Sequence, residues 1–371
     1  MAAQDAYQLR VCDLRSDDTL DVLPIEGVSF DDYIGKTGSL SGTIPIPNAD
    51  LATRAKAAIL PGRTMAYLER GGQIVWGGVV WTRTPTMAGR VHTLPIQGAG
   101  LESILRGHRM LTDTLTAAGV DQLDIARGMV DYAQDADGGN LGIEIDYAQT
   151  SGVLRDRTYL RYDLPWIGVL LDQLAATEQG FEWRIQCYAD TAGVRHRALR
   201  LGYPRLTPGG TSTTGDTVLT SPGPIVAYQL PEDATGLATA WQSRGASINT
   251  NQASASVPLM SALLTRPDLI ALGWPRLDGT SDYSSVEQQS TLDQHAAADL
   301  ARAAAPVTIP AVTILTGEAG LPALGGYVRL RIVDLWFPLP GLQARYRVVG
   351  LKVSPAERGR PETCELYLEA A

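Results

Sequence analysis

The stretch TMAYLERGGQIVWGGVVWTRTPTMAGRVHTLPIQGAGLESIL, residues 64–105, decides the fold of the N-terminal part of the chain. Residues 64–81 contain two segments rich in β-forming residues, and Gly71 and Gly72 between them supply the positive φ angles of a tight hairpin. Residues 90–97 follow as the next strand of an antiparallel meander. A Gly-Ala-Gly run then leads into the start of a helix, so the block predicts a small sheet that passes directly into a helix.

The residues before this block extend the same sheet. Residues 7–12 and 40–46 alternate between apolar and polar side chains, which is typical of half-buried strands. Asn48 is a suitable N-cap for a short helix that ends near Leu60. Residues 1–100 are therefore expected to form a first domain, an antiparallel sheet long enough to curl into a β-barrel.

Residues 101–223 change to a different pattern and predict an α/β lobe. Apolar residues recur at helical spacing over 121–134, with Asp121 near the helix N-terminus. A second helix begins around Pro165, and residues 181–201 alternate as a β-hairpin. Helices and a hairpin in one continuous segment are the basis for treating it as a separate lobe.

Two further regions complete the predicted organisation. Residues 207–224 are rich in Thr, Ser, Gly and Pro and predict an exposed polar joint. Strand patterns resume in 224–257 and 306–371, which we expect to form a second β-barrel. Residues 258–305 interrupt them as a helical inserted lobe. No repeat is visible at the residue level, so the two barrels are alike only in predicted architecture.

The inserted lobe carries two helical signals. A helix-like apolar patch covers residues 259–272. A stronger helical pattern covers 290–305, with Ser290 or Thr291 as its N-cap. The predicted fold class is α+β and rich in β structure.

The length and the charge of the chain limit the number of domains and the classes of function that we expect. The chain has 371 residues, of which 44% are hydrophobic and 19% are charged, and its formal net charge is −9. This length predicts more than one domain. An acidic protein is poorly suited to hold nucleic acid, because that affinity rests on Lys and Arg. No basic segment leads into an apolar one and no apolar run reaches 18 residues, so we expect neither a signal peptide nor membrane insertion.

The cysteines and histidines predict neither disulfides nor a metal site. Cys12, Cys187 and Cys364 are odd in number and far apart, so we expect buried free thiols. No histidine spacing of the HExxH type occurs. The four histidines fall in four different predicted elements: His92, His108, His196 and His295. For His92 and His295 we expect ordinary surface or half-buried roles.

A Gly-rich turn resembles part of a dinucleotide-binding fingerprint. Gly98 and Gly100 follow a strand and open a helix, and Asp121 lies about 20 residues further on. The third glycine position is Ser103, however, and the preceding strand belongs to a meander rather than to a parallel βαβ unit. The sequence therefore favours a tight strand-to-helix turn, with no cofactor.

The tripeptide Gly35-Lys36-Thr37 resembles the end of a phosphate-binding loop. The glycine that such a loop needs five positions earlier is Phe30. A solvated turn is the favoured interpretation.

No other motif supplies a catalytic or metal site. Asp135, Asp137 and Asn140 lack the glycine and the bidentate Glu of a calcium loop and favour a polar helix-ending turn. A GxSxG elbow is absent. An acidic pair such as Glu178 and Glu182 is the type of pair that a hydrolase would need. We predict no catalytic, cofactor-binding or metal-binding residues.

Two basic clusters leave two interpretations open. They cover residues 155–157 and 195–200. They are either contacts for an acidic neighbouring subunit or solvated faces of a strand or turn. Seven Trp and fourteen Tyr against three Phe also suit a protein with interfaces.

Four segments resemble a known family. They are YLERGGQIVWGGVVWTR at 67–83, LPIQGAGLESIL at 94–105, LIALGWPRL at 269–277 and TLDQHA at 291–296. They resemble the minor tail proteins of long-tailed phages of actinobacteria, which look like relatives of the trimeric baseplate hub. The resemblance covers the whole chain in layout.

This resemblance implies a structural virion protein rather than an enzyme. It implies two tail-tube-like barrels per subunit, and a homotrimer whose six barrels match a six-fold tail tube. The implied partners are a distal tail protein or tail tube above, tip or fibre proteins below and a tape measure protein in the lumen, through which DNA passes without specific binding. The implied location is the tail tip, after synthesis in the host cytoplasm. The alternatives are a receptor- or carbohydrate-binding tip protein and a cell-wall hydrolase.

Overall fold

The computed structural model describes residues 7–208, 216–248, 257–304, 310–357 and 359–370. The chain divides into two compact units, each described by itself below. Unit 1 contains Met1–Leu171, Phe181–Tyr228 and Ala311–Ala371, and unit 2 contains Asp172–Gly180 and Gln229–Pro310.

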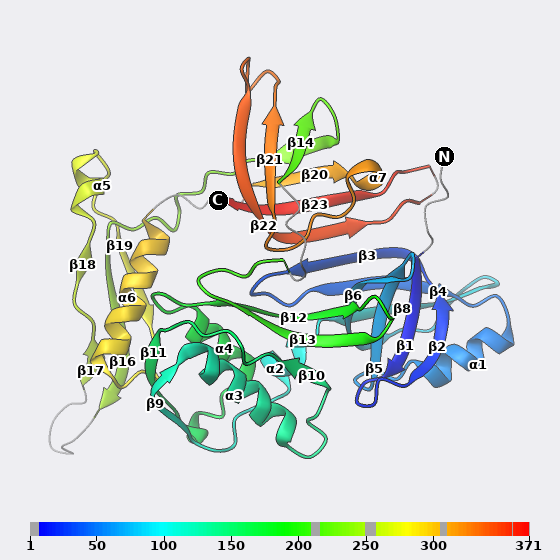
Figure 1. Ribbon diagram of the computed structural model, residues 1–371, viewed down its shortest axis with the longest axis horizontal. Helices are drawn as coiled ribbons and strands as arrows, with labels where there is room; N and C mark the ends of the chain where they lie inside the picture. Colours follow the sequence, from blue (N-terminus) through cyan, green and yellow to red (C-terminus); the bar gives the residue numbers. More distant parts are fainter. Residues whose placement is uncertain (1–6, 209–215, 249–256, 305–309, 358, 371) are drawn as a thin grey trace. The chain divides into compact units, whose positions relative to one another are not determined.

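A large, mostly antiparallel sheet of fourteen strands dominates unit 1 (Figure 1). Its strands are β1 (Tyr7–Asp13), β2 (Thr19–Pro24), β3 (Glu26–Tyr33), β4 (Ser39–Pro45), β5 (Thr64–Arg70), β6 (Gln73–Arg83), β7 (Thr86–Ala88), β8 (Val91–Ala99), β14 (Thr217–Ser221), β15 (Ile225–Gln229), β20 (Ala311–Leu315), β21 (Tyr327–Ile332), β22 (Leu342–Ser354) and β23 (Thr363–Ala370). Eleven follow one another in the order β15-β20-β23-β22-β3-β4-β8-β6-β5-β1-β2. The sheet therefore has an N-terminal half, β1 to β8, and a C-terminal half that starts at β14.

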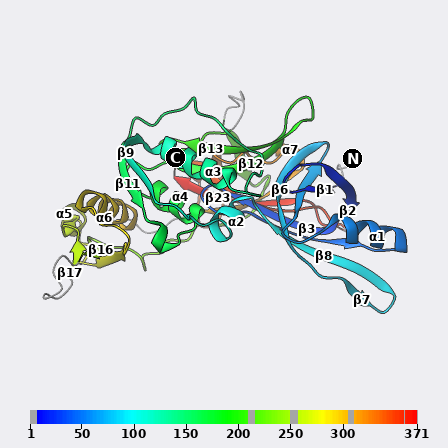
Figure 2. The same cartoon turned by 90° about the horizontal axis from the view of Figure 1, so that it is seen from below.

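The predicted meander is confirmed in the N-terminal half. β5 pairs with β6 and β6 with β8, all antiparallel. Gly71 and Gly72 have φ angles of 55° and 77°, which favour glycine because it has no Cβ. The predicted helix after Asn48 is α1 (Ala49–Ala58), and the Asn48 side chain accepts a hydrogen bond from the N–H of Leu51 at 2.9 Å. Figure 2 shows the β7–β8 hairpin projecting beyond the body of this half.

The expectation of two β-barrels is wrong, because no sheet of the residues described above closes on itself. The reason is a non-local pairing: β3 bonds to β22, from Phe30 opposite Val353 to Tyr33 opposite Gly350. A Cβ at Gly350 would lie 2.4 Å from the Tyr33 ring, so the glycine permits this close approach. The two halves thus merge into one open sheet, with β2 and β15 at the ends of its main path.

One hydrophobic cluster spans both halves. Phe30, Leu40 and Leu68 of the N-terminal half belong to it, together with Val353 and Leu366 of the C-terminal half, and each is at most 2% exposed. Shared burial on this scale makes the two halves one packed body.

The predicted α/β lobe follows β8 and belongs to unit 1 except for residues 172–180, which include the end of α4 (Ile167–Ala175). Its elements are α2 (Glu102–Gly107), β9 (Leu115–Asp121), α3 (Gln122–Asp135), β10 (Ile143–Ile145), β11 (Leu154–Tyr159), the short 3-10 helix η1 (Arg161–Asp163), α4 (Ile167–Ala175), β12 (Glu182–Ala189) and β13 (Arg195–Gly202). The hairpin β12–β13 and the helices α3 and α4 confirm the predicted pattern, and Asp121 is the N-cap of α3. The pair β9 and β11 was not predicted.

The polar joint predicted for 207–224 is only partly a linker. Its residues 217–221 form β14, which pairs in parallel with β21, and residues 209–215 lie outside the described residues. Thr217-Val218-Leu219-Thr220 are β-forming residues, and the pairing with β21 completes the strand. A short helix, α7 (Thr316–Ala319), follows β20.

Unit 2 is a four-stranded sheet covered by one helix. Its elements are β16 (Ala240–Ile248), β17 (Val257–Met260), β18 (Leu264–Thr265), α5 (Pro267–Ala271), β19 (Asp278–Asp282) and α6 (Gln289–Ala303). The helix predicted for 290–305 is confirmed as α6, but its N-cap is Gln288, without a side-chain bond. The patch predicted as helix-like at 259–272 is helical only in α5, which begins at Pro267. The segment before the proline pairs with β16 as β17 and β18 instead. Within the described ranges, no helix is both long and apolar enough to span a membrane.

Candidate functional site: buried ion pairs that join the parts of unit 1

The β1–β2 turn is fastened to the lobe by a cluster around Asp17. The Asp17 carboxylate accepts hydrogen bonds from the Tyr67 hydroxyl at 2.8 Å and from Arg195 Nε at 2.7 Å, and it also pairs with Arg197. Asp17 has a φ of 61°, so its backbone is in the left-handed region. The Tyr67 hydroxyl in turn accepts from Arg197 Nε at 2.8 Å.

Arg197 is the centre of this cluster. Its side chain is 4% exposed, and its Nη1 donates to the carbonyls of Leu14 at 2.6 Å and Leu141 at 2.7 Å. One guanidinium therefore binds the N-terminal half of the sheet and the lobe together. A buried charge needs this full set of partners, because desolvation is otherwise uncompensated.

A second cluster joins the two halves of the sheet around Glu362. Its carboxylate accepts from the Tyr7 hydroxyl and from Arg70 Nη1, both at 2.7 Å, and from the Thr316 hydroxyl. The residue is 2% exposed. Tyr7 and Arg70 belong to β1 and β5, so this carboxylate fixes the N-terminal half against the end of the C-terminal half.

A third cluster joins the lobe to the C-terminal half around Arg347. Its side chain is 1% exposed and donates to Glu182 at 2.8 and 2.5 Å, to Glu369 at 2.7 Å and to the Leu206 carbonyl. Hydrogen bonding to these two carboxylates raises the pKa of Arg347 despite its burial. Arg347 thereby donates to both carboxylate oxygens of Glu182, which is one of the two carboxylates considered for a hydrolase pair.

The β12–β13 hairpin covers a polar hollow of about 250 Å³ in unit 1. Asp32 and Arg184 form an ion pair at its wall, with 2.5 Å between Oδ2 and Nη2. Glu102 is 4% exposed and accepts from the N–H of Ile185 at 2.7 Å. Burial raises the pKa of Glu102, because the charged form is poorly solvated there.

Close contacts explain why β6 has glycine at both position 77 and position 78. A Cβ at Gly77 would lie 2.5 Å from Cβ and 2.8 Å from Sγ of Cys187. A Cβ at Gly78 would lie 2.2 Å from the Ala99 carbonyl oxygen. Both glycines therefore let the hairpin and β8 approach the backbone of β6.

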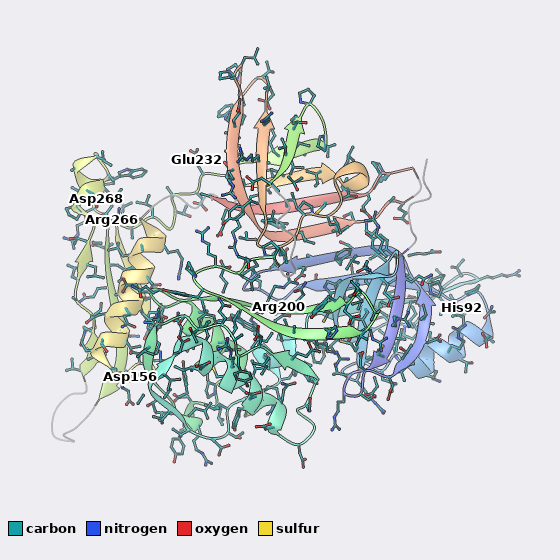
Figure 3. All side chains as sticks on the ribbon, viewed as in Figure 1. His92, Asp156, Arg200, Glu232, Arg266 and Asp268 are labelled. Carbon is teal, nitrogen blue, oxygen red and sulfur yellow. The ribbon has the colours of Figure 1, made fainter. Side chains whose placement is uncertain are left out.

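Three arginines of the two predicted basic clusters are buried rather than presented at the surface. Arg155, Arg157 and Arg197 are 5%, 9% and 4% exposed, and each is buried inside unit 1. Other members of these clusters reach the surface: Asp156, between the two buried arginines, is exposed, and Arg195 and Arg200 are half-buried; Figure 3 labels Asp156 and Arg200. Both sequence interpretations place the arginines at the surface, which is wrong for Arg155, Arg157 and Arg197.

The four histidines do not converge. His92 is exposed on β8, His108 stacks on Trp81, and His196 bonds to Glu144 at 2.7 Å. His295 was expected at or near the surface but is 4% exposed, because α6 covers the sheet of unit 2 there. Among the residues that the structure describes, no group of three or more His, Cys, Asp or Glu is placed to hold a metal.

The structure also locates the predicted turns and the predicted free thiols. Gly98 and Gly100 form the tight turn from β8 to α2, and the Gly35–Thr37 segment is the β3–β4 turn, bonded by Arg106. Cys12 and Cys364 are buried free thiols, as predicted, and Cys187 is half-buried.

Other sequence-predicted positions have local structural roles. Asp135 ends α3, and Asn140 accepts a hydrogen bond from the N–H of Gly142 in the following turn. The Asp121 carboxylate, at the start of α3, accepts hydrogen bonds from the N–H groups of Ser151 and Gly152. These contacts fit the helix-ending turn and the helix cap that the sequence favoured.

Sequence reasoning did not identify Asp17, Glu362 or Glu102. One signal was available for Arg197: with a period of two, it shares a strand face with Leu199 and Leu201, which marks an arginine on an apolar face. No comparable signal exists for Asp17 or Glu362, which lie in a turn and a loop.

The comparisons with known proteins relate this fold to phage tails. No protein-family model matches the sequence, and the search of curated proteins gives no significant match. Among solved structures, a tail protein from Neisseria meningitidis is 13% identical with a TM-score of 0.59, over 98% of this chain and 96% of that one. A 43 kDa tail protein of prophage MuSo2 from Shewanella oneidensis is 10% identical with a TM-score of 0.60, over 98% of both chains. The prophage tail protein gp18 from Listeria monocytogenes is 13% identical with a TM-score of 0.51, over 97% of this chain and 94% of that one. This chain therefore has the fold of these tail proteins, two of which are prophage proteins.

Proposed function

We propose that this chain is a structural tail hub protein of a bacteriophage, which connects the tail tube to the tail tip. The observation that carries the proposal is the similarity of fold over 98% of the chain to two tail proteins, one of them a prophage protein. The buried charges support a structural role, because Arg197, Arg347 and Glu362 bind partners within the chain. Such groups hold a shape rather than perform a reaction.

The proposed assembly is a homotrimeric ring. Each chain contributes two sheet halves that are fixed to each other by β3–β22 pairing and by Glu362. Three rigid copies then present six sheet halves around one axis, which suits a six-fold tube on one side and a three-fold tip on the other. A closed ring of identical copies needs a head-to-tail contact, in which two different surfaces of the chain meet.

The proposed neighbours follow from this position. A distal tail protein or the tail tube lies above the ring, tip or fibre proteins lie below, and the tape measure protein occupies the lumen before the genome passes. The net charge of −9 suits a passage for DNA, because acidic walls repel phosphate and prevent specific binding. Reversing acidic charges that line the channel should slow genome release, whereas unchanged release would contradict an acidic lining.

Immunoelectron microscopy of intact particles tests the proposed function. Antibodies against the chain should label the distal end of the tail, where the hub lies in this proposal. Label on the capsid, or absence of the chain from purified particles, would contradict it. A cell-wall glycan that binds the purified chain, or that it cleaves, would instead favour a receptor-binding protein or a hydrolase.

A further inference from the structure

The loop between β21 and β22 carries the most exposed apolar side chains of its half of the sheet. Leu335, Trp336 and Leu339 are 103%, 80% and 83% exposed. Isolated exposed apolar residues are common, but three large ones on one loop mark an interaction surface. We call residues 333–341 the knob.

The knob is ordered by its own hydrogen bonds. The Asp334 carboxylate accepts from the N–H groups of Trp336 and Phe337 at 2.9 and 2.8 Å, and from the Tyr228 hydroxyl at 2.6 Å. Phe337 points back toward the body, where its ring lies 6.0 Å from that of Tyr228. A loop that is held in this way presents Trp336 with little further loss of entropy on binding.

A hollow of matching character lies in the other half of the sheet, between α1 and the β7–β8 region. Its volume is about 350 Å³. Its apolar wall is formed by Ile46, Ala52, Ala55, Pro85 and Leu94. We call this hollow the socket. His92, labelled in Figure 3, lies at its wall and marks its position beside α1.

The charges of the knob and the socket are complementary. Lys56 and Arg83 line the socket, which has no carboxylate among its lining residues. Arg83 is fixed there, since its Nη1 donates to the Lys56 carbonyl at 2.8 Å and to the Ile59 carbonyl. Asp334 is the charged residue of the knob. The knob is thus an apolar tip with one acidic side chain, and the socket is an apolar hollow with two basic side chains, so their charges are complementary.

We infer that the knob of one copy of this chain inserts into the socket of a second copy. The knob cannot reach the socket of its own chain, because the two belong to opposite halves of one sheet that is fixed by β3–β22 pairing and a shared core (Figure 1). The contact joins two different surfaces, so it is head-to-tail and can be repeated around a ring. This inference rests on the proposed function and identifies the surfaces that would close the ring.

Sedimentation velocity of the full chain and two variants tests the contact. Trp336→Asp places a charge on the knob, and Ala52→Glu places one in the socket on a helix that tolerates Glu. Each variant should weaken self-association by about 30-fold or more, as expected for loss of a central aromatic anchor. Leu272→Asp, at a residue 77% exposed in unit 2, is the matched control and should leave self-association unchanged.

A mixing experiment then separates this contact from any other. The Trp336→Asp chain has an unmodified socket, and the Ala52→Glu chain has an unmodified knob. An equal mixture should therefore form a heterodimer at a concentration at which each variant alone is monomeric. Circular dichroism must show that both variants remain folded. No heterodimer, or Trp336→Asp assembling like the unmodified chain, would overturn the inference.

Two outcomes distinguish this inference from the proposed function. If rings persist in Trp336→Asp, the ring proposal stands and the knob contact falls. If the unmodified chain is monomeric and instead binds vesicles of phosphatidylglycerol and phosphatidylethanolamine through Trp336, both fall and the knob is a membrane contact.

Discussion

Replacing Arg197 by Met should destabilise unit 1 more than any other single arginine substitution on β13. The change removes the donors for Asp17, for the Tyr67 hydroxyl and for the carbonyls of Leu14 and Leu141. Breaking a buried pair costs about 3–5 kcal/mol. Asp17 is 27% exposed and keeps other partners, so we expect the lower end, about 3 kcal/mol.

Urea unfolding followed by tryptophan fluorescence measures this loss. Arg200→Met is the matched control, because Arg200 lies on the same strand and has fewer partners: it donates to Gln186 Oε1 at 3.0 Å and lies 5.2 Å from the Tyr188 ring centroid. That variant should lose about 1 kcal/mol. Hydrogen exchange of the 195–202 backbone should rise in Arg197→Met but change little in Arg200→Met. Equal losses in the two variants would refute the view that Arg197 joins the sheet to the lobe.

Three further substitutions test other parts of the fold. Gly77→Val should destabilise by about 2 kcal/mol or more in urea unfolding, because its Cβ would overlap Cys187; a neutral effect would contradict the packing of the hairpin on β6. Burial raises the pKa of Glu102 above its usual 4.5, so the native state binds its proton more tightly than the unfolded state, and stability falls as pH rises through the raised pKa. Glu102→Gln should therefore flatten the decline in unfolding free energy as the pH rises above the ordinary glutamate value of 4.5, and an unchanged slope would count against this assignment. Asn48→Ala should cost about 1 kcal/mol through loss of the α1 cap, whereas Asn48→Asp should cost less.

The parts of the fold that depend on neighbouring residues could be predicted from the sequence. The Gly71-Gly72 hairpin, α1 after Asn48 and α3 after Asp121 each carry their signal within a few residues. Pairing between strands that are far apart in the sequence carries no such local signal. β3 and β22 pair over more than 300 residues of sequence separation, and this single pairing converts two predicted barrels into one open sheet.

The candidate site was harder to predict for the same reason. Arginines in 195–200 suggested a charged surface, but partners from the β1–β2 turn and from Leu141 bury Arg197. Its position on the same strand face as Leu199 and Leu201 was a usable signal that composition alone hides. Glu362 had no such signal, because its partners Tyr7 and Arg70 come from distant strands.

Native mass spectrometry of the purified chain tests the central claim most directly. One rigid sheet with two fixed halves should assemble into a ring of three copies of the 39.7 kDa chain, with a mass of about 119 kDa. A chain that remains at 39.7 kDa at all accessible concentrations, or that forms only a two-fold dimer, would contradict the account.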